Sequence, residues 1–127
     1  LYYSGLGDGT IYEYDLGSGK SESIYKSDND TGYFYITFDG NYIWMDDEGY
    51  KNMAMYFNKQ SSSLDYTLYQ LDRDGKLAAK RIIPDEEKIF SIMHGDSRRM
   101  FMFSFVNNKI VYIDKSNIEK GDIKELR

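Results

Sequence analysis

Short stretches of alternating apolar and polar residues run along the chain, separated by turns rich in Gly, Asp, Asn and Ser. Three stretches share one phrase that ends on an aspartate: residues 11–15 (IYEYD), 68–72 (LYQLD) and 110–114 (IVYID). Successive side chains of a strand point to opposite faces, so the alternation predicts half-buried β-strands. Aspartate bonds readily to nearby backbone amides, so it predicts a turn after each copy. The pattern as a whole predicts a repeated antiparallel hairpin unit.

The three copies align without a gap, although their tyrosines do not occupy the same position. Tyrosine is the second residue in the first two copies and the third in the last. If the units are equivalent, Val111 takes the place of Tyr12 and Tyr69. Tyr112 then takes the place of Glu13 and Gln70.

Further strands are expected around the three copies of the phrase. They lie near residues 2–4, 20–26, 33–38, 42–45, 52–58, 77–83, 90–93, 99–106 and 122–127. Asp39-Gly40 predicts a type I′ hairpin turn, which needs positive φ at both central residues. The apolar run 99–106 would be adhesive at a sheet edge, so we expect a central strand there. Helical patterns are limited to single turns expected at 85–88 and 116–120.

The spacing of the phrase indicates the architecture. Its final aspartates are 57 residues apart between the first two copies and 42 apart between the last two, the excess falling in residues 46–64. A period near 42 with four strands per unit is typical of propeller blades. We therefore expect a single all-β segment over residues 1–127. It is divided into a partial package at 1–30 and larger packages at 31–87 and 88–127.

With a glycine beyond each copy (Gly19, Gly75 and Gly121), the phrase resembles the inner part of a blade in bacterial β-propeller repeat proteins. These are the TolB-like propellers and the bacterial surface lipoproteins with six to eight blades. The resemblance implies propeller-type blades of antiparallel meanders, about three in this chain. Three blades form an incomplete ring, which the remainder of a longer chain or self-association would complete. The chain starts at Leu1, which we read as the start of a fragment. A location outside the bacterial cytoplasm, at the cell surface or secreted, is also implied.

Composition and charge exclude several classes of partner. Acidic residues outnumber basic ones by 21 to 16, giving a net charge of −5, whereas nucleic-acid binding needs a basic stripe. The chain has no cysteine, so it offers neither a disulfide nor a thiolate metal ligand. Its longest apolar run, residues 100–106, is far too short to span a membrane. We expect no nucleic-acid partner and no membrane insertion.

Sites for catalysis or metal binding are weakly indicated. His94 is the single histidine, and beside Gly95 and Asp96 it is expected to serve a turn rather than a catalytic triad. Residues 28–32 and 72–75 resemble calcium loops but lack the full spacing of acidic ligands and the distal glutamate. Aspartates and asparagines of this kind are more often turn residues. We expect no cofactor or metal and assign no catalytic residue.

Aromatic side chains are the better candidates for function. Trp44, Tyr50 and Tyr56, with His94, are the candidate ligand contacts, because aromatic faces stack on sugars and peptides. Alternate aromatics can equally fill the space between sheets. That core role is the one expected for Phe34, Ile36, Phe38, Ile43, Met100, Met102, Ile110 and Tyr112.

The expected function is a non-catalytic binding or scaffold module that presents loops to a protein, peptide or glycan. The alternative is part of a propeller-supported hydrolase that acts on carbohydrate or peptide. Such an enzyme needs two facing carboxylates. The candidates are Asp39, Asp46, Asp47 and Asp96.

Overall fold

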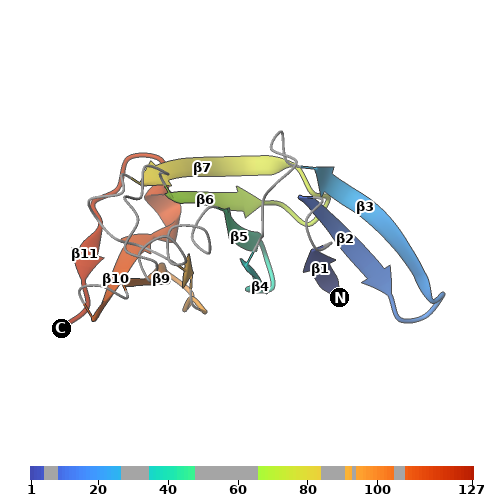
Figure 1. Ribbon diagram of the computed structural model, residues 1–127, viewed down its shortest axis with the longest axis horizontal. Coiled ribbons are helices and arrows are strands. Elements are labelled where there is room, and N and C mark those ends of the chain that lie inside the picture. The colour runs from blue at the N-terminus through green and yellow to red at the C-terminus, as the bar shows by residue number, and fades with distance from the viewer. Residues whose placement is uncertain (5–8, 27–34, 48–65, 84–90, 93, 105–107) are drawn as a thin grey trace, which may run out of the picture.

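A computed structural model describes residues 1–4, 9–26, 35–47, 66–83, 91–92, 94–104 and 108–127. These residues form an all-β fold of three antiparallel sheets, which follow one another in chain order (Figure 1). The strand expected at 52–58 and the turn expected at 85–88 lie outside the described residues. In the part of the chain that is described, no helix is long and apolar enough to cross a membrane.

Each sheet is a meander in which consecutive strands are neighbours. The N-terminal sheet contains β1 (Tyr2–Ser4), β2 (Thr10–Asp15) and β3 (Lys20–Lys26). The middle sheet contains β4 (Tyr35–Phe38), β5 (Ile43–Asp47), β6 (Tyr66–Leu71) and β7 (Leu77–Ile83). The C-terminal sheet contains β8 (Ser91–Ile92), β9 (Arg99–Ser104), β10 (Lys109–Asp114) and β11 (Lys124–Glu125), with a single 3-10 turn, η2 (Lys115–Asn117), after β10. The expectation that the run beginning at residue 99 is a central strand is confirmed, since β9 lies between β8 and β10.

The repeated phrase occupies β2, β6 and β10, and its register against the preceding strand is the same in all three sheets. Tyr12 pairs with Tyr3, Tyr69 with Met45, and Val111 with Met102. One residue further on, the paired residues are Glu13 and Tyr2, Gln70 and Trp44, and Tyr112 and Phe101. Val111 therefore takes the place of the two tyrosines, as the ungapped alignment predicts.

The final aspartate of each copy closes its strand into a turn. Oδ1 of Asp15 accepts from the amide of Gly17 at 2.8 Å, and Oδ1 of Asp72 accepts from the amide of Asp74 at 2.9 Å. Oδ1 of Asp114 accepts from the amide of Ser116 at 2.9 Å. The amides of these turn residues no longer pair with a neighbouring strand, and the aspartates supply their hydrogen-bond acceptors. The aspartates therefore act as turn residues.

The hairpin between β4 and β5 is present, but its turn differs from the type I′ prediction. Asp39 does not have positive φ; Gly40 does, with φ 94°. The Asp39 carboxylate instead accepts from the amides of Asn41 at 2.9 Å and Tyr42 at 2.8 Å. The carboxylate thus forms an Asx turn, and the only positive φ of the Asp39-Gly40 pair falls on the glycine, which adopts it without steric cost.

Two apolar clusters hold the sheets together. The N-terminal and middle sheets enclose Ile11, Ile43, Met45, Tyr69 and Leu71. The middle and C-terminal sheets enclose a second cluster, which includes Trp44, Tyr66, Leu68, Ile83, Ile92, Met100, Met102, Val111, Ile113 and Ile118.

Those of the expected core residues that the structure describes divide into three groups. Ile43, Met100 and Met102 are fully buried, as expected. Ile36 and Phe38 pack against the first cluster but are only partly buried. Ile110 and Tyr112 are half-buried and belong to neither cluster, because β10 turns them away from the middle sheet. Phe34 lies outside the described residues.

Candidate binding surface

The ligand contacts expected from sequence do not come together in the structure. Trp44 is fully buried between the middle and C-terminal sheets, where its ring is not accessible for stacking on a ligand. His94 is exposed, and its Nδ1 lies 3.3 Å from Oγ1 of Thr37, so it links the turn before β9 to β4. Tyr50 and Tyr56 lie outside the described residues.

Trp44 is instead part of a polar tie between two sheets. Its Nε1 donates to Oδ2 of Asp39 at 2.8 Å, and Nζ of Lys115 donates to the same oxygen at 2.7 Å. Lys115 also lies 5.5 Å from the centre of the Trp44 ring, within range of a cation–π interaction. Both charged side chains are only 11% exposed. Burial raises the pKa of Asp39, but the bonds from Lys115, two backbone amides and Trp44 outweigh it and hold this pKa well below its ordinary value.

Three of the four carboxylates considered for the hydrolase alternative accept hydrogen bonds from neighbouring groups. Asp39 forms the tie just described. Asp46 is fully buried, where its carboxylate accepts from the Tyr66 hydroxyl and from the Ile92 amide at 2.9 Å. Asp96 lies on the exposed turn before β9. The Asp47 side chain is outside the described part of the structure.

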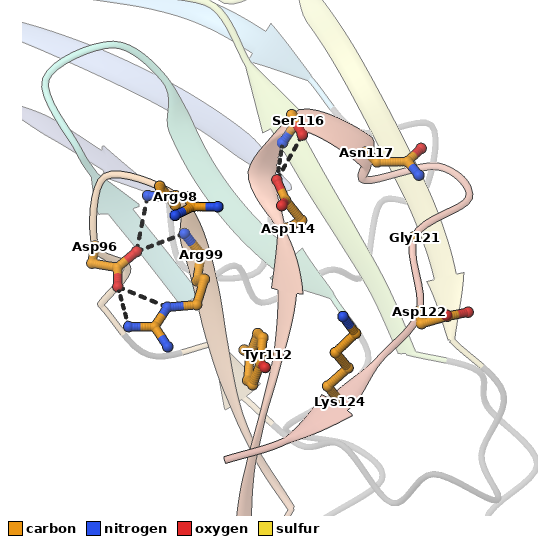
Figure 2. A pocket seen from close by; sticks show the side chains of 10 residues that line it. All are labelled: Asp96, Arg98, Arg99, Tyr112, Asp114, Ser116, Asn117, Gly121, Asp122 and Lys124. Atoms are coloured by element: carbon orange, nitrogen blue, oxygen red, sulfur yellow. Dashed lines mark hydrogen bonds and ion pairs between the residues drawn. The ribbon is translucent and has the colours of Figure 1, made fainter. Parts of the chain in front are cut away.

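A cleft lies on the outer face of the C-terminal sheet. Its volume is about 620 Å³. Figure 2 shows Asp96, Arg98 and Arg99 on one side, Asn117, Gly121 and Asp122 on the other, and Tyr112 and Lys124 between them. With Asp114, three acidic and three cationic side chains and the Tyr112 ring line the cleft.

The cleft belongs to a larger surface that we call the C-terminal face. Met100, Met102, Val111 and Ile113 point toward the middle sheet. Alternate residues of β9 and β10 point the other way. They are Phe101, Phe103, Ile110 and Tyr112, all half-buried, and they define the C-terminal face.

Arg99 is held in place above this face by its own turn. Its Nε and an Nη donate to Oδ2 of Asp96 at 2.9 and 2.6 Å (Figure 2). Its guanidinium carbon lies 5.1 Å from the Phe101 ring centre and 5.4 Å from that of Tyr112. The Arg99 side chain and the amides of Arg98 and Arg99 lower the pKa of Asp96 to about 2. The result is a fixed cation above a pair of aromatic rings.

Sequence reasoning did not identify this surface. It placed Tyr112 in the core and gave no role to Arg98 or Arg99. The sequence holds no signal that separates Tyr112 from its buried equivalent Gln70, because the same alternation fits a covered and an uncovered face.

No protein-family model matches the sequence, and no significant match was found among curated proteins or solved structures. Within the described ranges, no three His, Asp or Glu side chains lie close enough to hold a metal ion. The geometry of the chain itself therefore carries the functional argument.

Proposed function

We propose that this chain is a non-catalytic scaffold of propeller-blade type that binds a protein or peptide through its C-terminal face. The observation that carries the proposal is the Arg99 guanidinium, held by Asp96 above the half-buried rings of Phe101 and Tyr112. Arginine and tyrosine are the residue types that most often dominate binding energy at protein interfaces.

The blade assignment is supported by the order of the strands. Three successive meanders carry the same phrase in the same register, and each packs on the next through an apolar cluster. Stacked meanders of up to four strands are the units of which propellers are built. In such a scaffold the sheets are rigid, so a binding face keeps its geometry without a ligand.

A protein partner fits this face better than a small ligand does. The cleft is open, and the apolar residues continue beyond it along β9 and β10 to Phe103 and Ile110. An apolar centre with a charged rim is the usual composition of a protein interface. Arg98, Arg99 and Lys124 supply the positive part of that rim, and Asp96, Asp114 and Asp122 the negative part.

The test is binding of the labelled chain to a peptide array, a glycan array and immobilised copies of the chain itself. We expect a protein or peptide target and at least about 30-fold weaker binding for Arg99→Gln, the loss expected at an interface hot spot. The Asp96–Arg99 pair is 40–42% exposed, so breaking it costs the fold little.

Lys76→Gln is the matched control, because it makes the same change of charge at an exposed residue of the β6–β7 turn. It is expected to bind as the unaltered chain does. If the chain binds only to glycans, the partner is a glycan and the proposal of a protein or peptide partner is wrong. Absence of binding, or binding that is insensitive to Arg99, would refute the assignment of this face.

A further inference from the structure

Each of the two outer sheets of the described residues has a face that points away from the middle sheet. At one end is the C-terminal face. At the other is the face of the N-terminal sheet that points away from the middle sheet, which we call the N-terminal face. It presents Leu1, Tyr3, Tyr12 and Tyr14, and β3 adds Ser21 and Ser23 at its edge. Among the described strands, none packs on either face (Figure 1).

The N-terminal face has the positions that the other two sheets bury. The backbone of Leu1 bonds to that of Tyr14. The corresponding pairs are Ile43 with Leu71 in the middle sheet and Met100 with Ile113 in the C-terminal sheet. The equivalents of Leu1, Tyr3, Tyr12 and Tyr14 are Ile43, Met45, Tyr69 and Leu71 in the middle sheet, and Met100, Met102, Val111 and Ile113 in the C-terminal sheet; all eight are buried. In the N-terminal face, by contrast, Leu1 is 69% and Tyr3 41% exposed.

The C-terminal face matches the opposite half of the same junction. By register, Phe101 is equivalent to Trp44, Phe103 to Asp46, Ile110 to Leu68 and Tyr112 to Gln70. Those four residues of the middle sheet are all buried against the C-terminal sheet. All four residues of the C-terminal face are aromatic or aliphatic, whereas two of their buried equivalents are polar.

We infer that the N-terminal face of one copy of this chain docks on the C-terminal face of a second copy, repeating the junction that joins successive sheets within the chain. The inference rests on the proposed function, because it names the partner of the C-terminal face. Each chain carries both halves of the junction, one at each end. A head-to-tail contact therefore covers both faces with a single kind of interface.

The charged residues at the junction support a second copy as the occupant. Within the chain, Asp39 of the middle sheet forms an ion pair with Lys115 of the C-terminal sheet. Lys115 is the residue that directly follows the final aspartate of the phrase, Asp114. In the N-terminal sheet the residue at that position is Leu16, which is 74% exposed. A docked Leu16 would face Asp96, the equivalent of Asp39. Asp96 already has a cation from its own strand, Arg99, so an incoming leucine leaves no carboxylate unpaired.

The test is the mass of the chain in solution by sedimentation equilibrium, at concentrations up to about 1 mM. We expect association above the 14.9 kDa monomer. Tyr3→Lys, on the N-terminal face, and Tyr112→Lys, on the C-terminal face, should each weaken association at least about 30-fold. A chain that stays monomeric at the highest concentration would overturn the inference.

Mixing the two variants separates a head-to-tail contact from a face-to-face contact. Tyr3→Lys keeps an intact C-terminal face, and Tyr112→Lys keeps an intact N-terminal face. An equimolar mixture should therefore form a 1:1 dimer and nothing larger. If circular dichroism shows that both variants are folded and the mixture still does not associate, head-to-tail docking is contradicted.

Two further measurements complete the design. Ile82→Lys is the control, because it places a lysine at an exposed apolar residue of β7, away from both end faces, and should leave association unchanged. If either first variant does not fold, Leu1→Lys and Ile110→Lys replace the pair. A monomeric chain whose Arg99-dependent binding to another protein persists would refute the second copy as partner while the proposed function stands. Loss of all Arg99-dependent binding would refute both.

Discussion

Replacing Gly75 with alanine tests the packing of the N-terminal sheet on the middle sheet. Gly75 lies in the turn between β6 and β7 with φ 87°. A Cβ there would lie 2.8 Å from the carbonyl carbon of Ile24, in β3, and closer still to its oxygen. Ile24 is the extra residue of a bulge in β3, since its neighbours Tyr25 and Ser23 pair with successive residues of β2. The bulge has no ladder partner for Ile24, so its backbone is free to meet the turn of the next sheet.

Two terms set the cost of Gly75→Ala. Placing a side chain at positive φ costs roughly 1–2 kcal/mol. Forcing an extra carbon against backbone that is already packed costs roughly 1–3 kcal/mol more. Gly40 provides the matched control, since it has φ 94° and no atom within 4 Å of a Cβ built on it. Gly40→Ala should therefore lose only the first term, and the difference between the variants measures the contact between sheets.

The free energies of unfolding are obtained from urea denaturation followed by circular dichroism and by the fluorescence of Trp44, the single tryptophan. We expect Gly75→Ala to be less stable than Gly40→Ala by about 1–3 kcal/mol. Equal losses, within about 0.5 kcal/mol, would show that Gly75 does not pack against Ile24. The arrangement of the first two sheets would then be wrong.

Three further predictions concern the junction between the middle and C-terminal sheets. Lys115→Met should lower the free energy of unfolding by about 1.5–3 kcal/mol in urea denaturation, because it removes a charged hydrogen bond to a carboxylate that stays mostly buried. Stability should fall as the pH falls below 3.8, because the pKa of Asp39 is lower in the folded than in the unfolded chain; its contribution is present above 3.8 and is lost as the pH falls through the folded value. When the pH is lowered, the Asp39→Asn variant should lose stability less steeply than the unaltered chain does. Arg81→Met should lower the melting temperature, because Arg81 donates hydrogen bonds to the carbonyls of Ile118 at 3.2 Å and Gly121 at 3.0 Å. The loss of these bonds should cost about 1–3 kcal/mol of stability.

Local features of the fold were predictable from sequence because their physical causes are local. Alternation and turn chemistry placed β3 at residues 20–26 and β7 at 77–83, and they assigned the aspartates of the phrase to turns. The strand predicted at 122–127 was too long, because β11 covers only Lys124–Glu125. A strand ends where its pairing partner ends, which the sequence of one strand does not contain.

The candidate surface was not predictable, because it depends on which face of a strand is covered. Alternation shows that Ile110 and Tyr112 share a face, but the same pattern fits a covered and an uncovered side. Trp44 illustrates the opposite case. It was a candidate for ligand binding, yet it is buried because the C-terminal sheet packs against it, and Lys115, 71 residues later in the chain, lies 5.5 Å from the centre of its ring. Contacts over such distances follow from the stacking of sheets and leave no local pattern.

The same equivalence of positions limits the size of the assembly that head-to-tail docking can form. A contact that repeats one rotation from sheet to sheet either closes into a ring or continues as a filament. Each chain contributes three sheets, so two copies supply six, and known radial arrangements of sheets close with roughly four to eight. A dimer is therefore the smallest assembly in which both faces of every copy are covered. In an open series of any length, one N-terminal and one C-terminal face stay exposed at the ends. If the two end faces dock as inferred, closure at two copies would leave neither Tyr3 nor Phe101 in water, which an open series cannot do.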